Sequence, residues 1–189
     1  MKRTTLILLT AIGLCTACTG NKNDRGQEAT DTQTVSEPLV SEQYSNEEVP
    51  AGEPYTDFEQ PDTEGQAHRL SEYVGHGTWV LVDFWASWCG PCRAEMPNVV
   101  AAYERFHPKG LDIVGVSFDQ EHGAWTKAIA DLGMTWPQLS DLQGWENAAG
   151  QTYGINSIPA SLLIDPQGNI VARNLRGEEL HEVLAEILK

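Results

Sequence analysis

Apolar positions from residue 79 onward form alternating runs that predict strands and helices. Trp79–Trp85 and Leu111–Phe118 are almost continuously apolar, which is typical of strands covered on both faces of a sheet. The segment after residue 90 places apolar residues at helical spacing, namely Met96, Val99, Val100, Tyr103 and Phe106. Pro97 interrupts this stripe and predicts a kink in the helix. A second helix is expected over residues 123–132.

The remaining pattern completes an α/β fold. Trp136–Leu139 predicts a short strand and Trp145–Tyr153 a short helix. Ser161–Ile164 and Ile170–Asn174, joined by the turn 165–169, predict a hairpin, and Tyr55–Phe58 a short edge segment. The last helix carries Leu180, Val183, Leu184, Ile187 and Leu188. Strands that alternate with helices and then close in a hairpin and a helix indicate a mixed sheet with helices on both faces.

The first 50 residues have a different pattern. Met1-Lys2-Arg3 and the apolar run Leu6–Leu14 predict a signal peptide over residues 1–17, because the run is shorter than the about 20 residues that span a bilayer. Cys18 follows small residues as in a lipoprotein processing site, which predicts a lipid anchor on Cys18; an ordinary cleaved secretory signal is the alternative. Residues 18–50 are polar and predict a disordered acidic tether before a domain over 51–189.

The net charge of the chain limits the classes of molecule that it is expected to bind. The chain has 12 Lys and Arg against 27 Asp and Glu, a formal net charge of −15. Nucleic acids and anionic lipid surfaces attract basic patches, so this balance argues against both as partners. Membrane contact is expected through the lipid anchor only.

Two cysteines stand where the first buried strand gives way to a helix. Trp88-Cys89-Gly90-Pro91-Cys92 follows the apolar run directly. A helix N-terminus offers free N–H groups and a positive dipole end, which favour a thiolate, and the spacing lets one sulfur reach the other. A zinc site and inert core cysteines are the alternatives, but the other two cysteines, Cys15 and Cys18, lie in the expected signal peptide and at the expected lipid anchor, and the sequence has no closely spaced histidine pair. Reversible dithiol chemistry is therefore the prediction.

The stretch Val82 to Cys92 resembles the active-site segment of thioredoxins, and its continuation Arg93 to Pro97 resembles the TlpA/ResA-like thiol-disulfide oxidoreductases. The resemblance covers roughly residues 50–189. It implies a thioredoxin-like three-layer fold, no metal and no cofactor, with an insertion between Leu111 and Gly154.

We expect Cys89 to be the nucleophile and Cys92 the resolving thiol. A pKa lowered from about 8.5 to about 7 would raise the thiolate fraction of Cys89 at neutral pH from a few per cent to about half. Asp83 interrupts the apolar strand, and burial should raise its pKa, which suits a proton acceptor for Cys92; a partly solvated edge Asp is the alternative. The resemblance implies an active-site role for Glu95, although an acid in a first helical turn is favoured by the dipole alone.

Ile158-Pro159 resembles the cis-proline loop of the family, which faces the cysteines and offers the Ile158 backbone to a substrate segment. A plain strand-initiating proline is the alternative. With Gly90 and Pro91, Trp88 is expected to flank the site as an apolar platform, whereas Trp85 should pack in the core. The five histidines share no ligand spacing and are interpreted as surface residues.

The expected protein is thus an exported, lipid-anchored thiol:disulfide oxidoreductase on a bacterial membrane. Its Gly90-Pro91 and Ile158 resemble reducing members, which implies disulfide-containing protein substrates and electrons from a membrane-embedded thiol reductase. A thiol peroxidase of the related peroxiredoxin class is a second possibility, although Ala86 stands where those enzymes carry Thr or Ser. A binding lipoprotein without redox turnover is the third.

Overall fold

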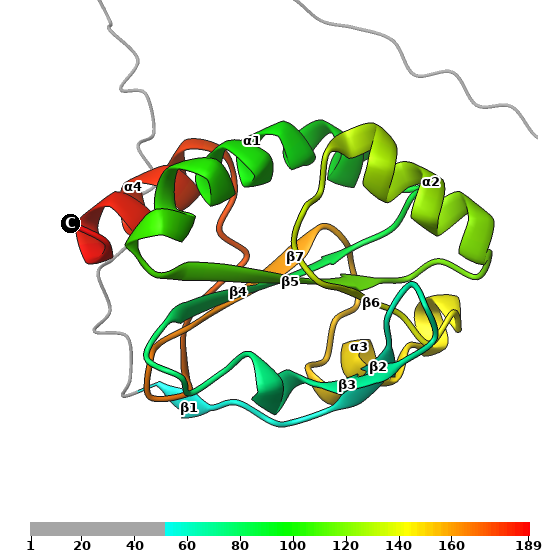
Figure 1. Cartoon of the computed structure of the whole chain (residues 1–189), viewed down its shortest axis with the longest axis horizontal. Coiled ribbons are helices and arrows are strands. Elements are labelled where there is room, and N and C mark those ends of the chain that lie inside the picture. Colours follow the sequence, from blue (N-terminus) through cyan, green and yellow to red (C-terminus); the bar gives the residue numbers. More distant parts are fainter. Residues whose placement is uncertain (1–51) are drawn as a thin grey trace, which may run out of the picture. The chain divides into compact units, whose positions relative to one another are not determined.

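The computed structural model describes residues 52–189 of the chain (Figure 1). The expected signal peptide over 1–17, the lipidation site Cys18 and the tether over 18–50 lie outside the described residues. Within 52–189, no helix has the length and apolar content needed to cross a membrane.

A six-stranded mixed sheet forms the centre of the described part. Its strands, from one edge to the other, are β1 (Glu53–Pro54), β8 (Asn169–Arg173), β7 (Ala160–Ile164), β4 (Trp79–Trp85), β5 (Leu111–Ser117) and β6 (Gln138–Leu139). The neighbours β4, β5 and β6 run parallel, and the pairs that join β4 to β7, β7 to β8 and β8 to β1 are antiparallel. The mixed sheet predicted from the hydrophobic pattern is confirmed.

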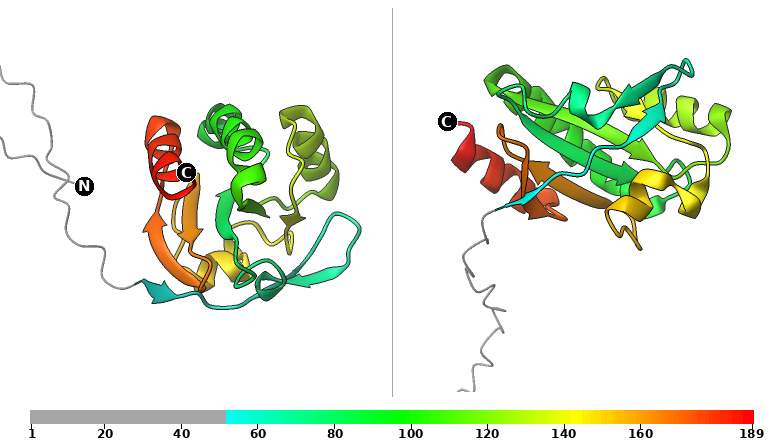
Figure 2. Two further views of the ribbon diagram at one scale, coloured as in Figure 1. Left: turned by 60° about the vertical axis from the view of Figure 1, so that its left-hand side comes forward. Right: turned by 90° about the horizontal axis from the view of Figure 1, so that it is seen from below.

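Helices cover both faces of this sheet, as a three-layer fold requires. One face carries α1 (Gly90–Phe106), α2 (His122–Leu132) and α4 (Gly177–Ile187), as Figures 1 and 2 show. The other carries α3 (Ala148–Thr152), the short helix η1 (Leu70–Glu72) and the hairpin of β2 (Glu59–Pro61) and β3 (Ala67–Arg69). A further short helix, η2 (His107–Lys109), ends in Gly110, whose positive φ turns the chain into β5.

Two expectations need correction. The segment Tyr55–Phe58 is not a strand; β1 and β2 lie on either side of it, and the β2–β3 hairpin was not predicted. The helix expected over 145–153 is divided into η3 (Gly144–Glu146) and α3, because Asn147 has a non-helical backbone and its side chain accepts a hydrogen bond from Gly150 N. Helix α1 continues as one helix through Pro97, and the kink expected at this residue stays a prediction.

Strand β4 lies at the centre of the sheet and sends its side chains alternately to the two faces. Phe84 is fully buried and packs against Phe118 and Tyr153, on the face that carries α3. Its neighbour Asp83 therefore points to the opposite face, where α1 and α4 lie. The predicted core position of Trp85 is confirmed, since it is fully buried.

Candidate active site

The cysteine pair is built into the first turn of α1. Cys89 is the N-cap residue with an extended backbone, and its Sγ accepts a hydrogen bond of 3.1 Å from Cys92 N. Pro91, in the first turn, has the fixed φ that a helix start needs and lacks the N–H that would have no partner there. A negative charge on the Cys89 sulfur would thus be stabilised by an N–H group and by the helix dipole.

Cys89 and Cys92 form a disulfide in this structure, with their Cα atoms 5.3 Å apart. Cys89 is 5% exposed and Cys92 is 1% exposed. The sulfur nearer the surface is therefore the one expected to be the nucleophile, and the deeper one is suited to an internal attack. The described residues hold no cluster of three or more His, Cys, Asp or Glu that could bind a metal ion.

The loop before β7 lies against the disulfide. The Ile158–Pro159 peptide bond is cis, as the family resemblance implied. The Cys89 Sγ lies 3.8 Å from the Ile158 carbonyl oxygen. The loop thus brings main-chain groups beside the Cys89 sulfur, where an extended substrate segment could pair with them.

Asp83 is the buried carboxyl group of the site. It is 5% exposed, and its Oδ2 has no hydrogen-bond partner among the described protein atoms. Burial, with a smaller contribution from the negative charge of Glu95, raises the pKa of Asp83 to about 7, against the opposing effect of the Arg176 charge. The raised pKa expected from sequence is confirmed. Across the sheet its partners in the neighbouring strands are the uncharged residues Gly115 and Ser161.

Glu95 is half-buried and both of its carboxylate oxygens are engaged. Oε1 accepts a hydrogen bond of 2.7 Å from Gly177 N, at the start of α4, and Oε2 accepts one of 3.2 Å from the Asn98 amide. Glu95 therefore connects α1 to α4 and lies close enough to Asp83 to act on its charge. This connecting position was not predicted.

Sequence reasoning also missed Arg176. Its guanidinium donates a hydrogen bond to the carbonyl of Pro159, and its charge acts on Asp83. Arg176 thus touches the cis-proline loop from the residue before α4. No motif in the sequence distinguishes it from other surface cations.

Asp119 was likewise not predicted as part of the site. Its carboxylate accepts hydrogen bonds from Ser87 N at 2.9 Å, from Ser87 Oγ at 2.5 Å and from Ser117 Oγ at 2.6 Å. The side chain is 1% exposed. These bonds fix the turn that leads from β4 to Trp88 and the cysteines.

Trp88 extends to the surface beside the cysteines, as expected of a platform. Its indole is 54% exposed and donates a hydrogen bond of 3.3 Å to the Phe118 carbonyl. Gly90 and Pro91 are also exposed, so the substrate side of the disulfide is open at this turn.

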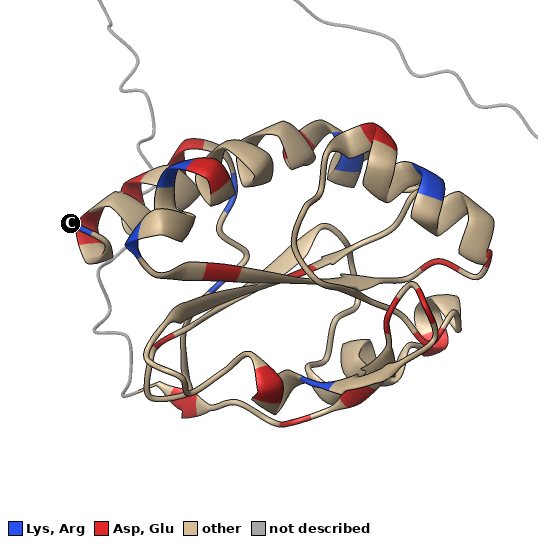
Figure 3. Cartoon of the chain, viewed as in Figure 1, with Lys and Arg blue, Asp and Glu red and all other residues tan. Residues whose placement is uncertain are grey.

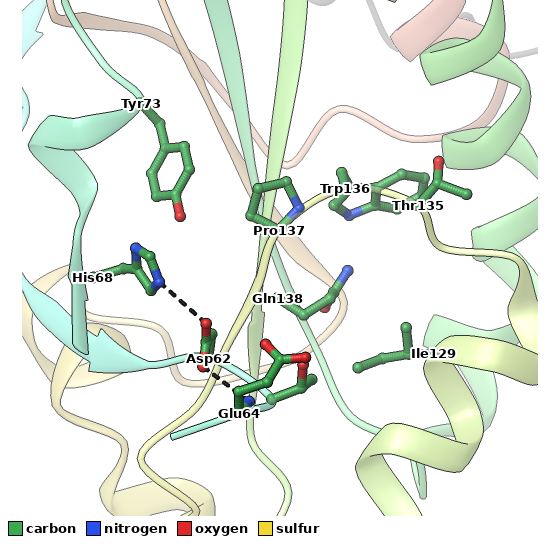
Figure 4. A pocket seen from close by; sticks show the side chains of 10 residues that line it. Asp62, Glu64, His68, Tyr73, Ile129, Thr135, Trp136, Pro137 and Gln138 are labelled. Carbon is green, nitrogen blue, oxygen red and sulfur yellow. Dashed lines mark hydrogen bonds and ion pairs between the residues drawn. The ribbon is translucent and has the colours of Figure 1, made fainter. Parts of the chain in front are cut away.

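A separate pocket of about 410 Å³ lies at the β6 edge of the sheet, away from the cysteines (Figure 4). The β2–β3 turn, β6 and α2 form its walls. His68 lies between Asp62 and Glu72, at 3.1 and 2.8 Å from their carboxylates, which raise the pKa of its imidazole. No residue of the cysteine motif or of the cis-proline loop lines this pocket, so it is not part of the redox site.

Comparisons with known proteins agree with this geometry. Residues 51–173 match the model of the AhpC/TSA family. The thiol-disulfide oxidoreductase ResA of Bacillus thuringiensis is 31% identical over 143 residues, which cover 76% of this chain and 79% of that protein. ResA of Bacillus subtilis is 29% identical over 125 residues, or 66% of this chain and 67% of the relative.

The chain is also similar to solved structures of thiol-disulfide oxidoreductases. The thioredoxin domain of a thiol-disulfide oxidoreductase from Bacteroides vulgatus superposes with a TM-score of 0.67 at 33% identity, over 73% of this chain and 97% of that one. A thiol-disulfide oxidoreductase from Bacteroides fragilis also gives 0.67, at 28% identity, over 72% and 100%. These relatives favour disulfide exchange over the peroxidase and binding-protein alternatives.

Proposed function

This chain belongs to the AhpC/TSA family and is a thiol-disulfide oxidoreductase of the ResA-like kind, and from that premise we propose that it reduces disulfide bonds of exported proteins. The observation that carries the proposal is the Cys89–Cys92 pair at the start of α1, facing the cis Ile158–Pro159 loop. The loop offers a substrate backbone a place to pair, and the helix terminus favours the attacking thiolate.

In the proposed reaction, the Cys89 thiolate attacks one sulfur of the substrate disulfide. The other substrate sulfur leaves as a thiolate and takes up a proton, and Cys89 remains bound to the substrate through a mixed disulfide. Cys92 then loses its proton and attacks the Cys89 sulfur, which releases the second substrate thiol. Two electrons pass to the substrate, and the enzyme is left with the Cys89–Cys92 disulfide of this structure.

Asp83 is the proposed acceptor of the Cys92 proton. It faces the side of the sheet that α1 covers, and it has a free carboxylate oxygen. With a pKa of about 7, about half of these groups are ionised at neutral pH and can take a proton. Glu95 supports this role indirectly, because its negative charge raises the proton affinity of Asp83.

The proposal includes export and anchoring through a lipid on Cys18. The basic and apolar segments of residues 1–14 and the small residues before Cys18 support it. Outside the cytosol the oxidised pair would need electrons from a membrane-embedded thiol reductase. Mass spectrometry of the mature N-terminus in the native host tests the anchor: an acylated Cys18 is expected, and an unmodified N-terminus downstream of it would contradict this part.

The central test is a Cys92→Ala variant expressed in the native host. It should accumulate exported proteins bound covalently to Cys89, which mass spectrometry identifies, and a Cys89→Ala control should accumulate none. Equilibration of the wild-type cysteine pair with redox buffers gives its reduction potential, which shows whether the protein is a net reductant or a net oxidant. A potential near that of a strong oxidant, about −120 mV, would contradict net reduction. Peroxide turnover that survives Cys92→Ser would favour a thiol peroxidase instead.

A further inference from the structure

Two indoles are exposed beside the reacting sulfur. Trp88 is 54% and Trp145 is 49% exposed, and these are the large apolar side chains that the described residues leave exposed. Their ring centroids lie 6.1 Å apart, and Trp145 also packs edge-on against Phe118 at 5.2 Å. Because Trp88 directly precedes Cys89, this aromatic surface adjoins the disulfide. Trp88 and Trp145 form the exposed part of this surface, and Phe118, from a third segment of the chain, is fully buried beneath Trp145.

Hydrogen bonds of the residues on both sides hold the segment that carries Trp145. Gly144 N bonds to the Asp119 carbonyl at 3.4 Å, just before Trp145. On its other side, the fully buried Asn147 donates to the Ser117 carbonyl at 3.2 Å and accepts from Gly150 N at 2.9 Å. The exposed indole is therefore carried by a segment with buried hydrogen bonds on either side.

Helix α3 also packs closely against Phe118. A Cβ atom at Gly150 would lie 2.4 Å from Phe118 Cζ, so a residue without a side chain is needed there. This approach fixes the ring on which Trp145 rests. An apolar side chain held rigidly yet half exposed marks a contact surface more than a core position.

The charge around the aromatic surface favours a cation. Glu121 and Glu146 are exposed, in the segments that carry Phe118 and Trp145. Residues 52–189 hold 20 Asp and Glu against 8 Lys and Arg, and Figure 3 marks these acidic and basic positions along the ribbon. The cations near the site, Arg93 and Arg176, lie on the α1 and α4 segments, and Arg176 is engaged with the Pro159 carbonyl.

We propose that Trp88 and Trp145, with the buried Phe118 ring supporting Trp145, bind a Lys or Arg side chain next to the disulfide of the substrate polypeptide. The cation would lie over an indole face, where the negative quadrupole of the ring attracts it, and the nearby carboxylates add to this attraction. The inference rests on the proposed function and narrows its substrates to polypeptides with a basic residue beside the reacting cysteine.

The test uses three synthetic peptides that differ in one residue, Arg, Glu or Phe, beside a cysteine carried as a mixed disulfide with a chromophoric thiol. Release of this thiol by the reduced protein is followed by stopped-flow absorbance. We expect the Arg peptide to react about tenfold faster than the Glu peptide at low salt. Trp145→Leu should reduce this ratio by about two- to fivefold, and Trp145→Phe, which keeps a ring, by less.

Equal rates for the Arg and Glu peptides, a fastest reaction with the Phe peptide, or an unchanged ratio in Trp145→Leu would each overturn the inference. Gly123→Ala is the matched control, because a Cβ at this exposed helical position meets no atom within 4 Å and the ratio should stay at the wild-type value. Thermal melting checks that each variant is folded. If the wild type released no thiol from any of the peptides or from a small neutral disulfide, the proposed function itself would fail.

Discussion

The two faces of the sheet at the end of β4 differ in what they supply to the site. On the face of α1 and α4 lie Cys92, the proposed resolving thiol, Asp83, the proposed proton acceptor, and Glu95, whose charge acts on Asp83. On the face of α3 lie aromatic rings, with Phe84 in the core, Phe118 above it and Trp145 at the surface. Asp83 and Phe84 are neighbours in one strand, so the pleat alone directs one residue to each face.

The proposed reacting groups thus lie on one face of the sheet, and the proposed substrate-binding rings lie on the other. A buried carboxyl group without a hydrogen-bond partner is costly for folding and useful for proton transfer, whereas rings packed edge to face stabilise the fold and present an apolar surface. Changes on the α1 face should therefore alter turnover and its pH dependence. Changes on the α3 face should alter stability and the choice of substrate. The predictions below test this separation.

The largest expected effect is that of Cys89→Ser. The serine hydroxyl cannot replace the thiolate, so disulfide exchange should fall by about 10³-fold or more. Stopped-flow release of a chromophoric thiol measures the loss. In Cys92→Ala the first attack should persist and the mixed disulfide should accumulate, visible by mass spectrometry. Exchange retained in Cys89→Ser would assign the nucleophile to another residue.

Asp83→Asn should have the next largest effect. Loss of the proton acceptor should slow the resolving step about 100-fold at pH 8. In the wild type this step should become faster as pH rises through about 7, the pKa of Asp83, because only the ionised carboxylate accepts a proton. The variant should lose this pH dependence. Single-turnover kinetics across pH 5–9 provide the measurement, and a preserved midpoint near 7 would rule out Asp83 as its source.

The same substitution should raise stability at alkaline pH. The folded pKa of Asp83 lies above the unfolded value of 3.8, so ionisation lowers the free energy of unfolding as pH rises from about 4 to about 7. Asn removes this cost, which is at most roughly 4 kcal/mol for a shift of this size. Urea unfolding of the oxidised proteins should show a more stable variant at pH 8 and a much smaller difference at pH 4. An equal difference at both pH values would contradict the assignment.

Gly150→Ala should damage the α3 face. The new Cβ would collide with Phe118, so we expect a loss of about 1–3 kcal/mol in the free energy of unfolding. Gly123→Ala is again the control and should be neutral or slightly stabilising. The pH midpoint that Asp83 sets should stay unchanged in both variants. A shift of that midpoint in Gly150→Ala would show that the two faces are coupled.

Sequence alone predicted the α1 face better than the α3 face. The bounds of β4 and the start of α1 follow from a local apolar run and a local motif, and Asp83 stands out because it interrupts that run. Trp145 and Asp119 gain their roles from partners far away in the chain, such as Phe118 and Ser87. A pattern read along the sequence contains no signal for such contacts, and η3 and α3 were merged for the same reason.

The smallest effects concern the two charged neighbours of Asp83. The negative charge of Glu95 raises the pKa of Asp83 and the positive charge of Arg176 lowers it. Glu95→Gln should therefore move the midpoint of the resolving step to lower pH, and Arg176→Gln should move it to higher pH. Both substitutions leave a polar group near Gly177 N and the Pro159 carbonyl, so turnover should change less than in Asp83→Asn.

Shifts of the pH midpoint in opposite directions in Glu95→Gln and Arg176→Gln would show that the charges of the two residues cause them. Glu95 and Arg176 also hold α4 to α1 and to the cis-proline loop, and loosening either contact would admit water to Asp83 and lower its pKa in both variants. Single-turnover kinetics of the pair, side by side, thus distinguish the two causes. Shifts in the same direction would mean that these residues act on Asp83 by positioning the loop and the helix, and their charges would then be secondary.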